Sequence, residues 1–296
     1  MSNSSSKRRF LLAAIAFSAL SLFGCGGTTT TATTSLSVTP VLGAVYGATV
    51  SVYNASGVLL GTGTTNASTG KVSVTLVGYT AGTPVIVKVT LAPGASYFNE
   101  HTGANVTVAA GSSVSLVSVM PAVTTGQAVG VTPLTNMAAK LAGVTADLVG
   151  TTPLTTTLTA SSIYVAVAKT NLALGLPAAT NLTSAPTAAT LAAPHPTETM
   201  GELLAAMATA TDPVTQAANL LAAVSTTGTV TNAAAIAVVN TILTTASGLN
   251  VTIAAPITAP DTATLNAAVT AVKTVIDAAV VVTPTGTGTG TGSTGG

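Results

Sequence analysis

The sequence predicts an α+β protein of two domains, an N-terminal antiparallel β-sandwich over residues 35–123 and a C-terminal all-α helical domain over residues 132–282. The first observation behind this prediction is the period of the apolar residues, which changes from two in the first range to 3.6 in the second. The second is the composition, because 48% of the residues are hydrophobic and only 5% are charged. Charged disordered tails have the opposite composition, so we expect folded cores.

The sandwich is predicted from short alternating runs with turn residues between them. Val, Leu and Ile alternate with Thr, Ser or Lys, as in strands with one buried face. These runs lie at Val50/Val52, Val72/Val74/Leu76, Val85/Val87/Val89/Leu91, Val106/Val108 and Val114/Leu116. The segment from Gly47 to Val74, with its Asn/Gly turns, resembles the carboxypeptidase regulatory-like and related immunoglobulin-like modules of bacterial surface proteins. This resemblance implies a stalk or binding unit without catalysis of its own.

Six helices are predicted from caps and apolar stripes. Thr132-Pro133 and Asp212-Pro213 each read as an N-cap followed by Pro at the first helical position. The other four helices are expected from Ser161 to Leu174, after a cap at Thr197, from Thr231 to Gly248, and from Asp261 through Ile276. The junction Val131–Ala142 is similar to a recurring segment of secreted bacterial lipoproteins that joins such a sandwich to an Ala-rich helical domain, a resemblance that implies architecture and no particular chemistry.

The first 24 residues have the pattern of an export signal. The basic stretch Lys7-Arg8-Arg9 precedes an apolar run, Phe10 to Phe23, that is shorter than the ~20 residues a spanning helix needs. The run ends in Leu22-Phe23-Gly24-Cys25, which resembles the lipobox of bacterial lipoproteins. The resemblance implies cleavage between Gly24 and Cys25, a diacylglycerol on the Cys25 sulfur, and a fatty acyl group such as palmitate on the new amino group. The general and the twin-arginine export routes both stay open.

Lipidation at Cys25 implies a partner and a location. The membrane would be bound through the N-terminal lipid, and Gly26 after the Cys resembles the pattern of lipoproteins sent to the bacterial outer membrane. The alternatives for Cys25 are a small buried hydrophobic residue or half of a disulfide, although it is the only Cys in the chain. Residues 25–34 read as a Thr-rich tether and 283–296 as a low-complexity Thr/Gly tail, and we expect no later segment to span a membrane.

The sequence offers few residues for catalysis. It lacks the nucleophile-elbow, zinc-protease and phosphate-loop motifs, so we expect no enzyme activity, no cofactor and no metal site. The best titratable cluster is His195 with Glu198 and Glu202, although acidic residues in a first helical turn are also what the helix dipole favours. Eight Lys and Arg residues, three of them within the leader, are too few to predict a nucleic-acid partner.

A short aromatic and polar stretch is the candidate recognition edge. It consists of Tyr97, Phe98, Asn99, Glu100 and His101. If this segment is a loop, these side chains form a small binding surface for carbohydrate or a cell-surface protein. The alternative is partial packing in the core, and in a strand Glu100 and His101 would point to opposite faces.

Three functions remain open from the sequence. The favoured one is a lipid-anchored envelope lipoprotein that acts as a non-catalytic binding or scaffold module, for example in adhesion. The first alternative is a self-assembling surface fibre or layer, because low charge and small side chains favour self-association. The second is a hydrolase of envelope polymers, for which the sequence supplies no clear catalytic cluster.

Overall fold

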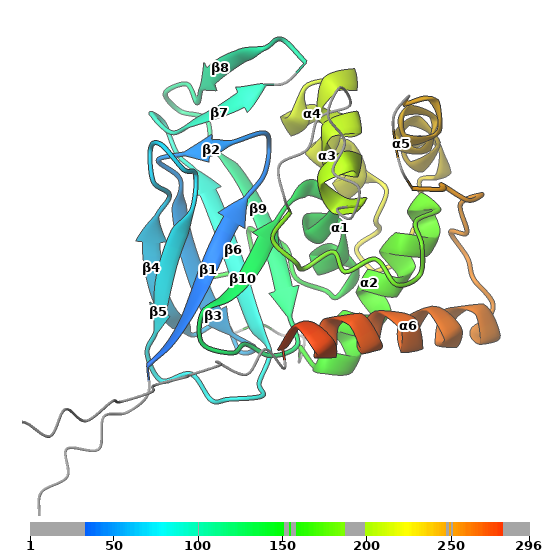
Figure 1. Ribbon diagram of the computed structural model, residues 1–296, viewed down its shortest axis with the longest axis horizontal. Helices are drawn as coiled ribbons and strands as arrows, with labels where there is room; N and C mark the ends of the chain where they lie inside the picture. Colours follow the sequence, from blue (N-terminus) through cyan, green and yellow to red (C-terminus); the bar gives the residue numbers. More distant parts are fainter. Residues whose placement is uncertain are drawn as a thin grey trace, which may run out of the picture. The chain divides into compact units, whose positions relative to one another are not determined.

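The computed structural model describes residues 33–99, 101–150, 154, 158–186, 199–246, 249 and 251–280 (Figure 1). Strands come first in the chain and helices follow, in one compact unit that begins at Thr33. The strands are β1 (Thr34–Pro40), β2 (Val45–Tyr46), β3 (Thr49–Asn54), β4 (Leu59–Thr64), β5 (Val72–Leu76), β6 (Val85–Leu91), β7 (Ser96–Asn99), β8 (Ala104–Thr107), β9 (Val114–Met120) and β10 (Gln127–Val131). The helices are α1 (Pro133–Leu141), α2 (Ala160–Leu174), α3 (Thr199–Ala210), α4 (Pro213–Ala222), α5 (Ala233–Thr245) and α6 (Thr262–Val280). The predicted α+β class, with strands before helices, is confirmed.

The strands form three small sheets within the described residues. Their orders are β4-β3-β6-β9, β10-β1-β5 and β2-β7-β8. All neighbouring strands are antiparallel except β1 and β10, which run parallel with Leu36 opposite Gln127. Strand β10 lies beyond residue 123, the predicted end of the sandwich. Its short QAVGV run lacks the alternation of apolar and polar residues that predicts a strand. Gly130 takes one of its positions because an added Cβ there would lie 2.4 Å from the Ser184 carbonyl oxygen.

The first two sheets enclose the sandwich core with alternate residues of each strand. Leu36 and Val38 of β1, Val50 and Val52 of β3, and Val87 and Val89 of β6 are buried in one apolar cluster. Strands β4 and β5, at the edges of different sheets, also approach each other. The Val77 amide donates to the Leu60 carbonyl at 2.8 Å, just after β5 ends. The period-two pattern therefore identified the core-facing residues of β3 and β6 correctly, whereas β1 was not among the predicted runs.

Strand β6 and strand β9 are buried on both faces. Their outward-facing residues Ile86, Val117 and Val119 join a second apolar cluster with Leu134 and Met137 of α1 and residues of the other helices. Burial on both faces explains why VIVKVTL and VSLVSVM are nearly continuous apolar runs. The four-stranded sheet thus forms a shared wall between the sandwich and the helices.

Helix α1 is fixed to this wall by polar contacts as well as apolar ones. It begins with a capping box, in which Thr132 and Thr135 exchange side-chain and backbone hydrogen bonds of 3.1 and 2.8 Å. One turn into the helix, Asn136 Oδ1 accepts the amide proton of Val117 on β9 at 3.0 Å. At its end, Lys140 Nζ donates to the Leu221 carbonyl of α4 at 2.7 Å.

The Thr-rich helices satisfy most of their hydroxyls internally. The hydroxyls of Thr170, Thr209, Thr241, Thr245 and Thr274 each donate to the carbonyl four residues earlier, at 2.7–2.9 Å. These bonds let Thr lie in a helix without a separate polar partner. The cap of helix α5 lies one residue later than predicted, because the side chain of Asn232, and not that of Thr231, accepts from the Ala235 amide. The predicted cap Thr197 lies outside the described residues.

Helix α6 is, among the described residues, the one helix whose length and composition would allow it to cross a membrane. A helix that packs along one stripe against its own protein can meet the same criterion, and α6 packs in this way. Ala268, Val272 and Ile276 are buried on one side, while Lys273 and Thr274 are exposed. No later segment was expected to span a membrane, because none has about 18 consecutive strongly apolar residues.

Replacing Gly61 with Ala should destabilise the sandwich. An added Cβ would lie 2.3 Å from the Thr75 carbonyl oxygen of β5, so backbone must move where β4 and β5 approach. We expect a loss of about 1–3 kcal/mol in the free energy of unfolding, measured by urea denaturation. The control Thr62→Ser, at the exposed neighbouring position, should change it by less than about 0.5 kcal/mol. Equal stability of Gly61→Ala and the native protein would contradict the close approach.

Replacing Asn136 with Ala should also destabilise the protein, by removing the acceptor for the buried Val117 amide. A buried donor without a partner costs about 1–3 kcal/mol, which thermal or urea unfolding resolves. Asn266→Ala, at an exposed position on α6, is the matched control and should have almost no effect. If both variants unfold alike, the Asn136 contact has no part in holding α1 to the sheet.

Candidate functional site

The aromatic and polar stretch predicted as a recognition edge lies beside Asp212, at the junction of α3 and α4. Asp212 is the N-cap of α4, and its Oδ1 accepts the amide protons of Val214 and Thr215, each at 3.0 Å. Its Oδ2 accepts two further hydrogen bonds from strand β7, from the Tyr97 hydroxyl at 3.1 Å and from Asn99 Nδ2 at 2.7 Å. One carboxylate therefore joins a helix start to a strand more than a hundred residues earlier.

Strand geometry decides which residues of the stretch reach Asp212. Tyr97 and Asn99 are two apart on β7, so they share a face, and both are buried. Phe98 points to the other face and is half-buried. His101 follows in the turn, where its Nδ1 lies 2.9 Å from the Thr209 carbonyl of α3. Glu100 lies outside the described residues.

The side chains of Tyr97, Asn99 and His101 thus bond to the protein's own helices. Asn99 also accepts the amide protons of His101 and Thr102 through Oδ1, at 3.0 and 3.2 Å, which fixes the turn after β7. Burial, the charge of Asp212 and its hydrogen bond together raise the pKa of Tyr97 to about 12. The phenol therefore keeps its proton and stays a hydrogen-bond donor through the physiological pH range.

A small apolar pocket lies close to this junction. It is lined by Leu42, Gly43, Leu204, Met207 and Gln216, among others, and has room for about one water molecule. Gln216 Nε2 donates to the Met207 carbonyl at 3.4 Å, whereas its Oε1 has no hydrogen-bond partner among the described residues. The pocket is too small for an organic ligand in this conformation.

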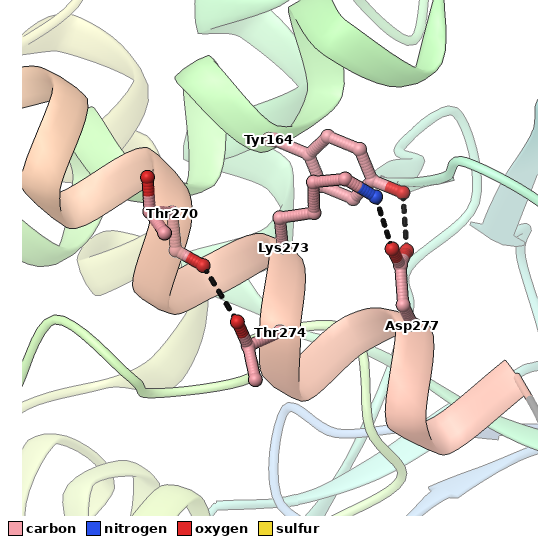
Figure 2. Close-up of polar contacts among 5 residues, drawn as sticks. All are labelled: Tyr164, Thr270, Lys273, Thr274 and Asp277. Atoms are coloured by element: carbon pink, nitrogen blue, oxygen red, sulfur yellow. Dashed lines mark hydrogen bonds and ion pairs between the residues drawn. The ribbon is translucent and has the colours of Figure 1, made fainter.

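A second polar cluster joins α2 to α6 (Figure 2). The Tyr164 hydroxyl donates to Asp277 Oδ1. Lys273, which lies one turn before Asp277 on α6, forms an ion pair with Asp277 Oδ2 through its Nζ. Lys273 Nζ also lies 5.2 Å from the centre of the Tyr164 ring. Thr274 beside them bonds to the Thr270 carbonyl at 2.9 Å.

The pKa values in this cluster follow from its contacts. Burial, the hydrogen bond to Asp277 and the charge of Asp277 raise the pKa of Tyr164 above its usual range. Burial acts to raise the pKa of Asp277, but the hydrogen bonds from Lys273 and Tyr164 and the Lys273 charge outweigh it, so the pKa falls below its ordinary value. Asp277 is thus an ionised acceptor, and Tyr164 a protonated donor, at neutral pH.

Of the other candidates from the sequence, the structure describes only Glu202. Glu202 is buried on α3, while His195 and Glu198 lie outside the described residues, as do Gly24 and Cys25. In the part of the chain that the structure describes, no three His, Cys, Asp or Glu side chains gather where they could hold a metal ion.

Some features of these clusters have a local sequence signal and others have none. The Asp212-Pro213 pair signalled a helix cap, and that cap is present, but nothing in the sequence linked it to Tyr97 and Asn99. The spacing of Lys273 and Asp277, four apart on a helix, is a signal that could have identified their ion pair. Tyr164, which completes the cluster, is 113 residues from Asp277 and carries no comparable signal.

Comparison with known protein families, with curated proteins and with solved structures finds no match.

Replacing Asp212 with Asn should lower the pKa of Tyr97 from about 12 only part of the way toward 10, because burial, the largest cause of the raised pKa, remains while the charge of Asp212 is removed. Asn is also a good N-cap, so α4 should stay intact. The pKa can be followed by tyrosinate absorbance as the pH rises, with Tyr97→Phe identifying the signal. Asp261→Asn, at the exposed cap of α6, is the control and should leave the titration unchanged. An unaltered curve in Asp212→Asn would mean that the carboxylate does not act on this phenol.

Proposed function

We propose that this protein is a lipid-anchored lipoprotein of the bacterial cell envelope, on the outer membrane, that acts as a non-catalytic binding or scaffold module. The observation that carries the proposal is the leader, in which a basic stretch and an apolar run end at Cys25, the only Cys of the chain. Eight residues later, at Thr33, the described fold begins. A short linker between an anchor and a folded body suits a tethered surface protein.

The use of polar side chains supports the non-catalytic part of the proposal. Tyr97, Asn99 and His101 hold the strand-rich region to α3 and α4, and Asp212 accepts five hydrogen bonds there. Tyr164, Lys273 and Asp277 are bonded to one another between α2 and α6. Groups used in this way stabilise a framework, and a framework that presents uncharged Thr and Ala surface suits binding of carbohydrate or of another surface protein.

Lipidation can be tested directly in a bacterial host that processes lipoproteins. We expect mass spectrometry of the full chain to show cleavage before Cys25 and a mass increase matching diacylglycerol and an acyl group on the first residue. Cys25→Ala should abolish the lipid and move the protein from the membrane fraction to the soluble one, because two or more acyl chains are needed for stable anchoring. Gly27→Ala, two residues later, is the matched control and should remain lipidated. An unmodified thiol at Cys25, or an uncleaved leader, would overturn the proposal.

A further inference from the structure

One end of the sandwich carries a group of exposed aliphatic side chains. Val58 and Leu59, where β4 begins, are 59% and 51% exposed, and Val77, directly after β5, is 75% exposed. The hydrogen bond from the Val77 amide to the Leu60 carbonyl places Val77 beside the start of β4. We call these three residues the apolar end. Single exposed aliphatic residues are common on proteins, but three together at one end are a candidate contact surface.

The chain enters the fold at this same end. In the antiparallel register of β1 and β5, Thr34 lies opposite Leu76, so the first described residues are next to Val77. Figure 1 shows the start of β1, the β3–β4 turn and the end of β5 together at the bottom of the strand-rich region. The apolar end is therefore the part of the fold that lies nearest along the chain to any anchor upstream of Thr33.

Three turns around the apolar end carry no charge. The β3–β4 turn (residues 55–58), the β5–β6 loop (77–84) and the β9–β10 loop (121–126) contain no Asp, Glu, Lys or Arg. The Gly126 amide donates to the Ser35 carbonyl at 2.8 Å, and the Val123 amide donates to the Tyr79 hydroxyl at 2.8 Å, so these loops lie beside the start of β1. An uncharged surface can enter the headgroup region of a bilayer without desolvating an ion.

We propose that the apolar end rests on the surface of the bilayer that holds the lipid of Cys25. This inference depends on the proposed lipidation. An extended chain spans at most about 3.6 Å per residue, so the eight residues from Cys25 to Thr33 keep this end within about 30 Å of the lipid. Such a tether gives the apolar end a high effective concentration at the membrane surface. Three aliphatic side chains, which would bind a membrane only weakly from solution, are then enough to hold this end against it.

Labels at two matched serine positions can show which end of the sandwich faces the bilayer. Ser56 lies in the β3–β4 turn at the apolar end, and Ser68 lies in the β4–β5 turn at the other end of β4. Both are exposed, and each donates its amide to an Asn side chain two residues earlier, at 2.9 and 2.8 Å. Because the sulfur of Cys25 would carry lipid, Ser56→Cys or Ser68→Cys supplies a unique thiol for a nitroxide label.

The experiment uses the full lipidated chain in phosphatidylcholine vesicles, with electron paramagnetic resonance to measure collisions of the nitroxide with a water-soluble nickel chelate and with oxygen. We expect the Ser56→Cys label to collide several-fold less with the chelate, and more with oxygen, than the Ser68→Cys label. Adding Leu59→Asp and Val77→Asp should make the two labels equally accessible. Val238→Asp, which replaces an aliphatic residue on α5 that is also 51% exposed, should leave the difference unchanged.

Three results would overturn the inference, and they separate it from the proposed function. Equal accessibility of the two labels in protein whose lipid is confirmed by mass spectrometry overturns docking and leaves the anchor intact. In the second result, the two labels still differ in accessibility after Leu59→Asp and Val77→Asp, in protein that circular dichroism shows to be folded. That result assigns the membrane contact to other residues and also overturns the inference. A mass spectrum without lipid on Cys25 overturns both proposals.

Discussion

The contact between Asn136 and Val117 is the constraint on which the arrangement of strands and helices depends. Strand β9 is the last strand of its sheet, so its outer amides need partners once helices cover them. Asn136 supplies one such partner from α1, while Leu134 and Met137 cover the outer apolar face of β6 and β9. Helix α1 in turn contacts β9, β10, α2 and α4, so it joins the strands to two of the other helices.

Charged residues are scarce, and two carboxylates act as cross-links between distant segments. Asp212 and Asp277 each accept a hydrogen bond from a tyrosine more than a hundred residues earlier in the chain, Tyr97 and Tyr164. A phenol can reach across an apolar surface and still deliver a polar group, so it suits this purpose. The Thr hydroxyls are satisfied within their own helices, which explains how a chain with many Thr residues builds a helical core without further charges.

The sequence predicted what depends on local patterns and failed where the cause is tertiary. Period-two and 3.6 patterns gave the order of strands and helices, and the Thr132-Pro133 and Asp212-Pro213 caps are where they were expected. The parallel strand β10 was missed because its register depends on β1, almost a hundred residues earlier. The partners of Asp212 were missed for the same reason, since only the fold brings β7 to the start of α4.

The predicted recognition edge has contacts within the fold as well. Tyr97, Asn99 and His101 join the small β2-β7-β8 sheet to α3 and α4, so substitutions there would alter the framework before they altered any bound ligand. The side chains of Val58, Leu59 and Val77, by contrast, are exposed. In a protein with so few charges, the surface left for partners is made of methyl and hydroxyl groups. Contacts of this kind are individually weak, and a lipid anchor would make them effective by keeping the surface beside its target.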